Sequence, residues 1–207
     1  KRPRHIVIVH NILSPRKIPI VRTLRVMSQF SLIVALASEA VDAIASAYHI
    51  PQNRLRTITN DIDEHFWRPQ VNALVDPQLI LSVGKAKRDY ATLFGAASGL
   101  SARLHVQASS QWLLPVNHTT RPNIPQNVTV GAYLSAPQLR DLYAQAVFCV
   151  TSLAIGAHHS AGTSVIREAA AMGKAIIVAA DSDMKDFLLP EETGLAVPAG
   201  DESALRR

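Results

Sequence analysis

The sequence is poor in cysteine and in aromatic residues. Cys149 is the only cysteine among the 207 residues, and it lies in the apolar run AVFCVTSL. A single cysteine cannot form a disulfide within the chain, so we expect a buried strand residue and a reducing compartment. Aromatic residues make up 5% of the sequence, and they do not alternate with the basic residues as in proteins that stack single-stranded nucleic acid. We therefore expect no nucleic-acid partner.

Three further features are missing. No uncharged apolar stretch approaches the roughly 18 residues that a membrane-spanning helix needs, so we expect no such helix. The nine glycines form no Gly-x-Gly pattern, which argues against a nicotinamide dehydrogenase of the dinucleotide-binding type. The sequence also lacks an initiating Met and opens almost directly in a strand-like run. We expect a fragment whose upstream targeting signals are out of view.

The composition is that of a folded protein with a basic N-terminal part. Hydrophobic residues make up 48% of the chain, and 21 basic against 16 acidic residues give a formal net charge of +5. Much of the excess lies early in the chain, at Lys1, Arg2, Arg4, Arg16, Lys17, Arg22 and Arg25. Such a surface suits phosphates or the anionic lipids of a membrane, and a merely solvated basic face is the alternative. We expect a cytoplasmic protein with peripheral contact at the inner membrane face.

Short β-branched runs alternate with helical stretches along the whole chain. This order is typical of α/β proteins, in which helices cover a parallel sheet. The predicted strands fall at 5–10, 31–38, 55–59, 79–84, 103–109, 127–133, 147–153, 175–180 and 194–199. The predicted helices lie around 21–30, near 40–50, from Tyr90, from Pro137, within 160–174, near 184–189 and from Asp201. A capping box of Ser135 and Gln138 supports the helix that starts at Pro137.

The stretch SAGTSVIREAAAMGK at 160–174 has the composition of an anion-binding helix start. Gly162, Thr163 and Ser164 follow an apolar strand and open a helix, where backbone N–H groups and the helix dipole attract a phosphate. Glu168 lies four residues after Ser164, so both share one helix face. A carboxylate there can accept hydrogen bonds from both hydroxyls of a ribose. The alternative is a surface glutamate in the first turns of a helix.

The order of several motifs resembles glycosyltransferase family 4, whose members have the GT-B architecture of two facing Rossmann-like domains. The segments that carry the resemblance lie at 38–69, 80–93, 127–146, 161–179 and 193–201. The resemblance implies two Rossmann-like α/β domains with parallel sheets, both incomplete in this chain. Residues 1–70 would form the C-terminal part of the N-terminal, acceptor-side domain. Residues 71–207 would form the C-terminal nucleotide-sugar-binding domain, truncated at its end.

The resemblance also assigns roles to individual residues. Lys85 and Arg88, in the loop GKAKRDY, match the basic pair that binds the donor diphosphate together with Gly162, Thr163 and Ser164; Lys87 could substitute in that pair. Opposite charge at this place would stabilise the leaving group. Glu168 matches the ribose-binding glutamate.

Two further assignments concern the sugar. Ser160 stands where the family usually has a first glutamate, and with Ala161 it would face the donor sugar. His10, at the end of the strand HIVIVH, matches a histidine that faces the same sugar and takes part in catalysis.

Together these matches predict a retaining, metal-independent glycosyltransferase. It would move a sugar from a nucleotide sugar to an unknown glycan or lipid-linked acceptor, without a cofactor. Two alternatives stay open. The replacement at Ser160 suits a non-catalytic nucleotide-sugar binding module. Another GT-B enzyme, such as a nucleotide-sugar epimerase, would use the same donor site but would need catalytic carboxylates of its own.

Two Asp-x-Asp triplets raise the question of a metal. They comprise Asp61 with Asp63, and Asp181 with Asp183. Carboxylate oxygens of this kind bind divalent cations. The first triplet lies in a predicted interdomain linker and the second begins a predicted helix, where Asp is a common cap. We expect no metal at either.

Overall fold

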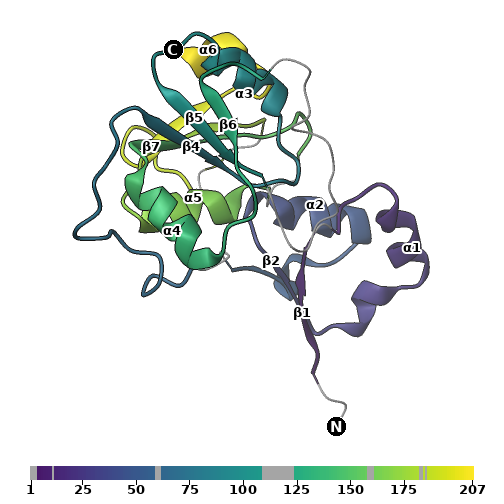
Figure 1. Ribbon diagram of the computed structural model, residues 1–207. Helices are drawn as coiled ribbons and strands as arrows, with labels where there is room; N and C mark the ends of the chain where they lie inside the picture. The colour runs from purple at the N-terminus through teal and green to yellow at the C-terminus, as the bar shows by residue number, and fades with distance from the viewer. Residues whose placement is uncertain are drawn as a thin grey trace. The chain divides into compact units, whose positions relative to one another are not determined.

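The computed structural model describes residues 4–10, 12–58, 62–108, 124–157, 161–181, 184 and 186–207. The chain divides into two compact units, which contain the described residues of 1–60 and of 61–207. Each unit has one β-sheet with parallel strands (Figure 1). The predicted fold class, two α/β units with parallel sheets, is confirmed. Among the described residues, no helix has the length and apolar character needed to cross a membrane.

The first unit is a three-stranded sheet in the order β1-β2-β3. Its strands are β1 (Ile6–Val9), β2 (Leu32–Ala35) and β3 (Leu55–Thr57). The segments between them contain α1 (Lys17–Thr23), η1 (Val26–Gln29), α2 (Glu39–Tyr48) and η2 (Gln52–Arg54). A buried apolar cluster that includes Ile33, Ile44 and Leu55 joins the sheet to its helices. This cluster provides the hydrophobic stabilisation of the unit.

The helix predicted at 21–30 differs from the structure. The helical segment begins earlier, at Lys17, and is interrupted before η1. The interruption falls at Arg25, whose φ of 49° lies in the left-handed region. A residue in that conformation ends an α-helix. Helical periodicity alone did not reveal this break.

The second unit is a six-stranded parallel sheet in the order β6-β5-β4-β7-β8-β9. Its strands are β4 (Leu79–Val83), β5 (Arg103–Gln107), β6 (Val128–Val130), β7 (Phe148–Ser152), β8 (Ile176–Ala179) and β9 (Gly194–Val197). Its helices are α3 (Tyr90–Ala97), α4 (Ala136–Gln145), α5 (Thr163–Ala171) and α6 (Glu202–Arg206). The described residues near 184–189 form a hydrogen-bonded turn in place of the predicted short helix.

Successive side chains of a strand point to opposite faces of the sheet. Both faces of this sheet are apolar and are covered by helices. Leu81 and Cys149 belong to the buried cluster that also contains α4 and α5 residues. Leu104 and Val150 belong to the cluster with α3 and α6 residues. Cys149 is fully buried in its strand, as the sequence predicted.

The strand order creates a switch point between β4 and β7. From β4 the chain continues to β5 on one side (Figure 1), whereas from β7 it continues to β8 on the other. The two loops that leave the carboxyl ends of these neighbouring strands therefore diverge. Doubly wound sheets bind ligands in the crevice at this place.

Side-chain caps fix several helix starts in the second unit. The backbone N–H of Ser135 donates to Gln138 Oε1 at 2.9 Å, which supports the predicted capping box. The carboxylates of Asp89 and Asp201 accept from Thr92 N at 3.0 Å and from Ala204 N at 2.8 Å. These bonds satisfy helix N–H groups that have no partner within the helix.

The segment that precedes β4 packs on the second unit. Trp67 lies edge-on against Tyr143 of α4, with 5.6 Å between the ring centroids. Asp63 accepts hydrogen bonds from the backbone of the two residues before Trp67 and closes a turn there. Asp76 N donates to Gln145 O, at the end of α4, at 2.8 Å. Residues 62–76 thus follow α4 closely, although the sequence analysis assigns those up to residue 70 to the first domain.

Candidate functional site

The loop after β4 is built around Arg88. Arg88 is 9% exposed, and its Nε and Nη1 atoms donate to Val83 O at 3.3 Å and to Ala86 O at 2.9 Å. Gly84 has a φ of 109°, and a Cβ added there would overlap the guanidinium of Arg88. The loop therefore needs glycine at position 84, both for its backbone conformation and for the guanidinium that lies against it.

Burial also affects the charge of Arg88. Loss of solvent lowers the pKa of Arg88 below its usual value, while the nearby Tyr90, Tyr143 and Glu168 act in the opposite direction. Lys85 is half-buried and Lys87 is exposed in the same loop. The loop thus holds three basic residues at different depths, and Arg88 has a structural role that its motif did not predict.

Backbone hydrogen bonds join this loop to the end of β7. Asp89 N donates to Ser152 O at 2.9 Å, and Ala154 N donates to Lys87 O at 2.9 Å. The chain after Ala154 leads toward α5. The two loops predicted to bind a diphosphate therefore share one edge of the sheet, at the switch point between β4 and β7.

The start of α5 has the predicted form. Gly162 is the N-cap with a φ of 80°, and a Cβ there would lie 3.0 Å from Leu153 Cδ2. Thr163 is buried and Ser164 is exposed, while Ala161 is buried just before the helix. The first turn of a helix attracts anions through its N–H groups and its dipole. Ser160 lies outside the described residues.

Glu168 is half-buried in α5 and accepts a hydrogen bond from Tyr143. The Tyr143 hydroxyl donates to Glu168 Oε2 at 2.7 Å. Burial raises the pKa of Glu168 to about 7, against the lowering effects of the Tyr143 hydrogen bond and the Arg88 charge. A carboxylate in this setting gains from a ligand that donates hydrogen bonds, because they replace the water it has lost.

Sequence reasoning missed Tyr143. A fully buried tyrosine requires a partner for its hydroxyl, and the helix DLYAQA places that residue among apolar neighbours. Its partner lies 25 positions away in the chain. The sequence could therefore indicate a buried hydroxyl but not the carboxylate that accepts from it.

His10 belongs to the first unit. It is exposed and directly follows β1, at the carboxyl end of that strand. The other described residues of the predicted site lie in the second unit. The position of His10 after a strand agrees with the sequence analysis, and its catalytic role stays a prediction.

The described part of the chain contains no group of three or more His, Cys, Asp and Glu side chains that could hold a metal ion. Asp63 closes the turn before Trp67, and Asp181 Oδ2 accepts from Gly156 N at 2.9 Å. Asp61 and Asp183 lie outside the described residues.

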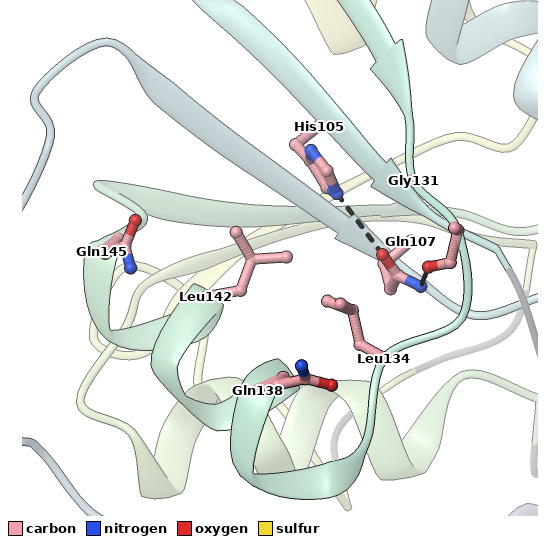
Figure 2. A pocket seen from close by; sticks show the side chains of 8 residues that line it. His105, Gln107, Gly131, Leu134, Gln138, Leu142 and Gln145 are labelled. Carbon is pink, nitrogen blue, oxygen red and sulfur yellow. Dashed lines mark hydrogen bonds between the residues drawn. The ribbon is translucent and has the colours of Figure 1, made fainter.

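A cavity of about 310 Å³ lies between α4, β5 and the loop after β6. Figure 2 shows His105 and Gln107 on β5, with Gln138, Leu142 and Gln145 on α4. Gln107 lies 3.4 Å from His105 Nε2 and also donates to the carbonyl of Ala132. These polar groups line the cavity. Because they hydrogen-bond within the protein, fewer of their donors and acceptors are available to a ligand.

Three solved proteins have a fold similar to that of this chain. HepE from Anabaena, solved in complex with UDP and glucose, superposes with a TM-score of 0.78 at 13% identity, over 98% of this chain and 60% of its own. A glycosyltransferase from Rickettsia africae has a TM-score of 0.72 at 15% identity, over 97% of this chain and 58% of its own. Sucrose-phosphate synthase from Thermosynechococcus elongatus has a TM-score of 0.72 at 18% identity, over 93% of this chain and 51% of its own.

These likenesses establish the fold. The predicted GT-B type of Rossmann-like fold agrees with that of the three solved proteins. The chain spans between about half and three fifths of their length. No protein-family model matches the sequence, and no curated protein matches it either.

Proposed function

We propose that this chain is part of a retaining glycosyltransferase related to family 4, and that its second unit binds the nucleotide-sugar donor. The observation that carries the proposal is the meeting of two predicted donor-binding loops at one switch point. The loop of Lys85 and Arg88 follows β4, and the loop that leads to α5 follows the neighbouring strand β7. HepE binds UDP and UDP-glucose, so UDP is the first ligand to test.

The donor would lie across these two loops. Lys85 and the first turn of α5, with Gly162, Thr163 and Ser164, would bind the diphosphate. Arg88 would shape its loop and add positive charge from beneath. Glu168 would accept from the ribose hydroxyls, one helical turn after Ser164. Ser160 and Ala161 would face the donor sugar.

The transfer itself would need the whole protein. The bond between the sugar C1 and the diphosphate oxygen breaks, and a bond from C1 to the acceptor oxygen forms on the same face. The acceptor proton moves to the departing diphosphate, whose charge the basic loop stabilises. His10, in the acceptor-side unit, would position the sugar. We assign no metal or cofactor to this reaction, and the acceptor would be a glycan or a lipid-linked molecule.

Replacement of Glu168 by Ala tests the donor site. Hydrogen bonds to a charged group contribute about 1.5 to 3 kcal/mol, so UDP affinity should fall about 10- to 100-fold. Titration calorimetry of this 207-residue chain measures the change. The exposed Glu192 provides a matched control, since Glu192→Ala should bind UDP as the parent does. Equal affinity in the parent and Glu168→Ala would remove Glu168 from the site.

A non-catalytic binding module is the second candidate, and the serine at position 160 favours it. Slow hydrolysis of a panel of nucleotide sugars by the full-length protein separates the alternatives. A transferase should release free sugar from at least one donor, and an epimerase should return an altered nucleotide sugar. Tight nucleotide binding without either product would support the module.

We also propose that the first unit contacts anionic membranes. Ile20 and Leu24 are 60% and 64% exposed on and just after α1. Exposed basic residues surround them, namely Arg16, Lys17, Arg22 and Arg25. An exposed apolar face bordered by basic residues is typical of surface-bound helices.

Vesicle sedimentation tests this contact. The parent should bind vesicles with phosphatidylserine and not vesicles of phosphatidylcholine alone. Each basic residue near such a surface contributes about 1 kcal/mol. The double variant Arg22→Gln with Arg25→Gln should therefore bind about 30-fold more weakly. Binding that is equal for both lipids, or unchanged in the double variant, would contradict the proposal.

A further inference from the structure

Tyr143 is a fully buried tyrosine with its hydroxyl in an apolar cluster. Its side chain is 0% exposed, and the cluster contains residues of α4, α5 and the sheet. The hydroxyl donates to Glu168 Oε2 at 2.7 Å. This bond crosses from α4 to α5. It satisfies a group that would otherwise be costly to bury.

The same bond restricts the carboxylate of Glu168. The last torsion of a glutamate side chain is broad, so an unpaired carboxylate rotates easily. Tyr143 holds Oε2, and within the described residues no hydrogen bond to Oε1 is found. Fixing one oxygen fixes the plane of the group. Oε1 is then the atom with capacity for a ligand.

The ring of Tyr143 packs against a row of aromatic side chains. Trp67 lies edge-on against it at 5.6 Å and 85°, and Phe66 lies edge-on against Trp67 at 5.1 Å. The Arg140 guanidinium stands over the Phe66 ring at 4.9 Å. Edge-to-face aromatic pairs stabilise one ring orientation. The segment before β4 thus packs against the ring of Tyr143 and restricts its orientation.

We propose that Tyr143 is a positioning residue for nucleotide binding. Its hydroxyl holds Glu168 Oε2 so that Oε1 accepts from the ribose, and Trp67 braces its ring. The inference rests on the proposed function, because it assigns Glu168 to the ribose. It adds a residue that touches no substrate and acts only through Glu168.

The variant Tyr143→Phe keeps the ring and removes the hydroxyl. UDP affinity of this chain is measured by calorimetry from pH 5.5 to 9. The hydrogen bond favours the ionised carboxylate, so its loss should move the midpoint of the pH dependence upward by about one unit. Near pH 7 the ionised fraction of Glu168, and with it the UDP affinity, should fall about 5-fold. Simple loosening of the core would lower the affinity without moving the midpoint.

Tyr48→Phe is the matched control. Tyr48 is also buried, and its hydroxyl donates to Ile12 O at 2.6 Å in the first unit. This variant should keep the parental midpoint and affinity. A second variant, Trp67→Leu, keeps the Tyr143 hydroxyl and removes the ring that packs against Tyr143. It should lower UDP affinity less than Tyr143→Phe does.

The outcomes separate two failures. A parent that binds no UDP would overturn the proposed function, and this inference with it. A parent that binds UDP, with an unchanged midpoint in Tyr143→Phe, would overturn the positioning role alone. Equal shifts in Tyr143→Phe and Tyr48→Phe would overturn it as well. If Tyr143→Phe fails to fold, an unchanged UDP affinity in Trp67→Leu would count against the proposal.

Discussion

Glu168 combines burial, a hydrogen bond and nearby positive charge in one carboxyl group. Burial raises its pKa to about 7, although Tyr143 and Arg88 favour the ionised form. The desolvation of the carboxylate therefore exceeds the stabilisation that the protein alone supplies. Ribose hydroxyls would add the missing hydrogen bonds. Glu168 is thus a carboxylate at the predicted site that accepts from Tyr143 and has capacity for further hydrogen bonds.

The pKa of Glu168 predicts a pH-dependent stability. The group ionises near pH 4.5 in the unfolded chain and near pH 7 in the folded one. Between these values the folded state retains a proton that the unfolded state releases, so the free energy of unfolding falls as the pH rises. The contribution of Glu168 to this free energy should be highest below pH 4.5 and level off above pH 7. The loss from this group is up to about 3 kcal/mol.

Chemical denaturation of the parent and Glu168→Gln measures this effect. Gln cannot ionise, yet it can still accept from Tyr143. The difference in unfolding free energy between the two proteins should change between pH 4.5 and pH 7 and stay constant above. A constant difference across that range would show that the carboxyl of Glu168 titrates normally.

At this scale the sequence predicts residue types better than their contacts. Its motifs predict roles for Glu168 and the basic loop, and these roles stay predictions. It does not reveal that Arg88 lies beneath its own loop or that Tyr143 reaches Glu168. Both facts depend on packing between α4, α5 and the sheet, which local patterns do not encode.

At the scale of elements, the two loops at the switch point differ in the groups that they would offer to a donor. The β4 loop is rich in basic residues and the start of α5 presents backbone N–H groups. Two hydrogen bonds, from Asp89 N and Ala154 N, tie these loops together. A ligand that spans both should therefore gain from a preformed arrangement.

Lys85→Ala should separate phosphate binding from nucleoside binding. Of the groups of UDP, its ammonium would contact the diphosphate and not the nucleoside, so the ratio of UDP to uridine affinity should fall about 10-fold. The fall should be larger at low salt, where charges are less screened. Arg207→Ala, at the exposed end of the chain, is the control and should keep the ratio. A parallel loss of both affinities in Lys85→Ala would indicate damage to the fold.

Most elements were predictable because their local signals agree with the fold. β-Branched runs gave the strands, and the capping residues Ser135 and Asp201 gave two helix starts. The helix predicted at 21–30 was wrong in its limits, because Arg25 adopts a left-handed conformation without a glycine to signal it. The helix predicted near 184–189 is a turn among the described residues. Short apolar segments carry too little periodicity to distinguish the two.

At the scale of the whole molecule, the order of strands decides which loops are neighbours at the proposed donor site. The sequence predicted two α/β units with parallel sheets. It did not predict that β4 and β7 would be neighbours, because that pairing joins segments about seventy residues apart. All strands of this sheet are parallel, so their carboxyl ends share one edge, and this order makes the loops after β4 and β7 neighbours there.

The most direct test of the account is to map UDP binding by NMR on the isotope-labelled chain. If the switch point binds UDP, the amide signals of 84–89 and 162–168 should shift most on titration. Signals of the cavity residues His105 and Gln145 should move less. Shifts that concentrate away from both loops, or no saturable shift at all, would contradict the claim that the β4–β7 switch point binds a nucleotide.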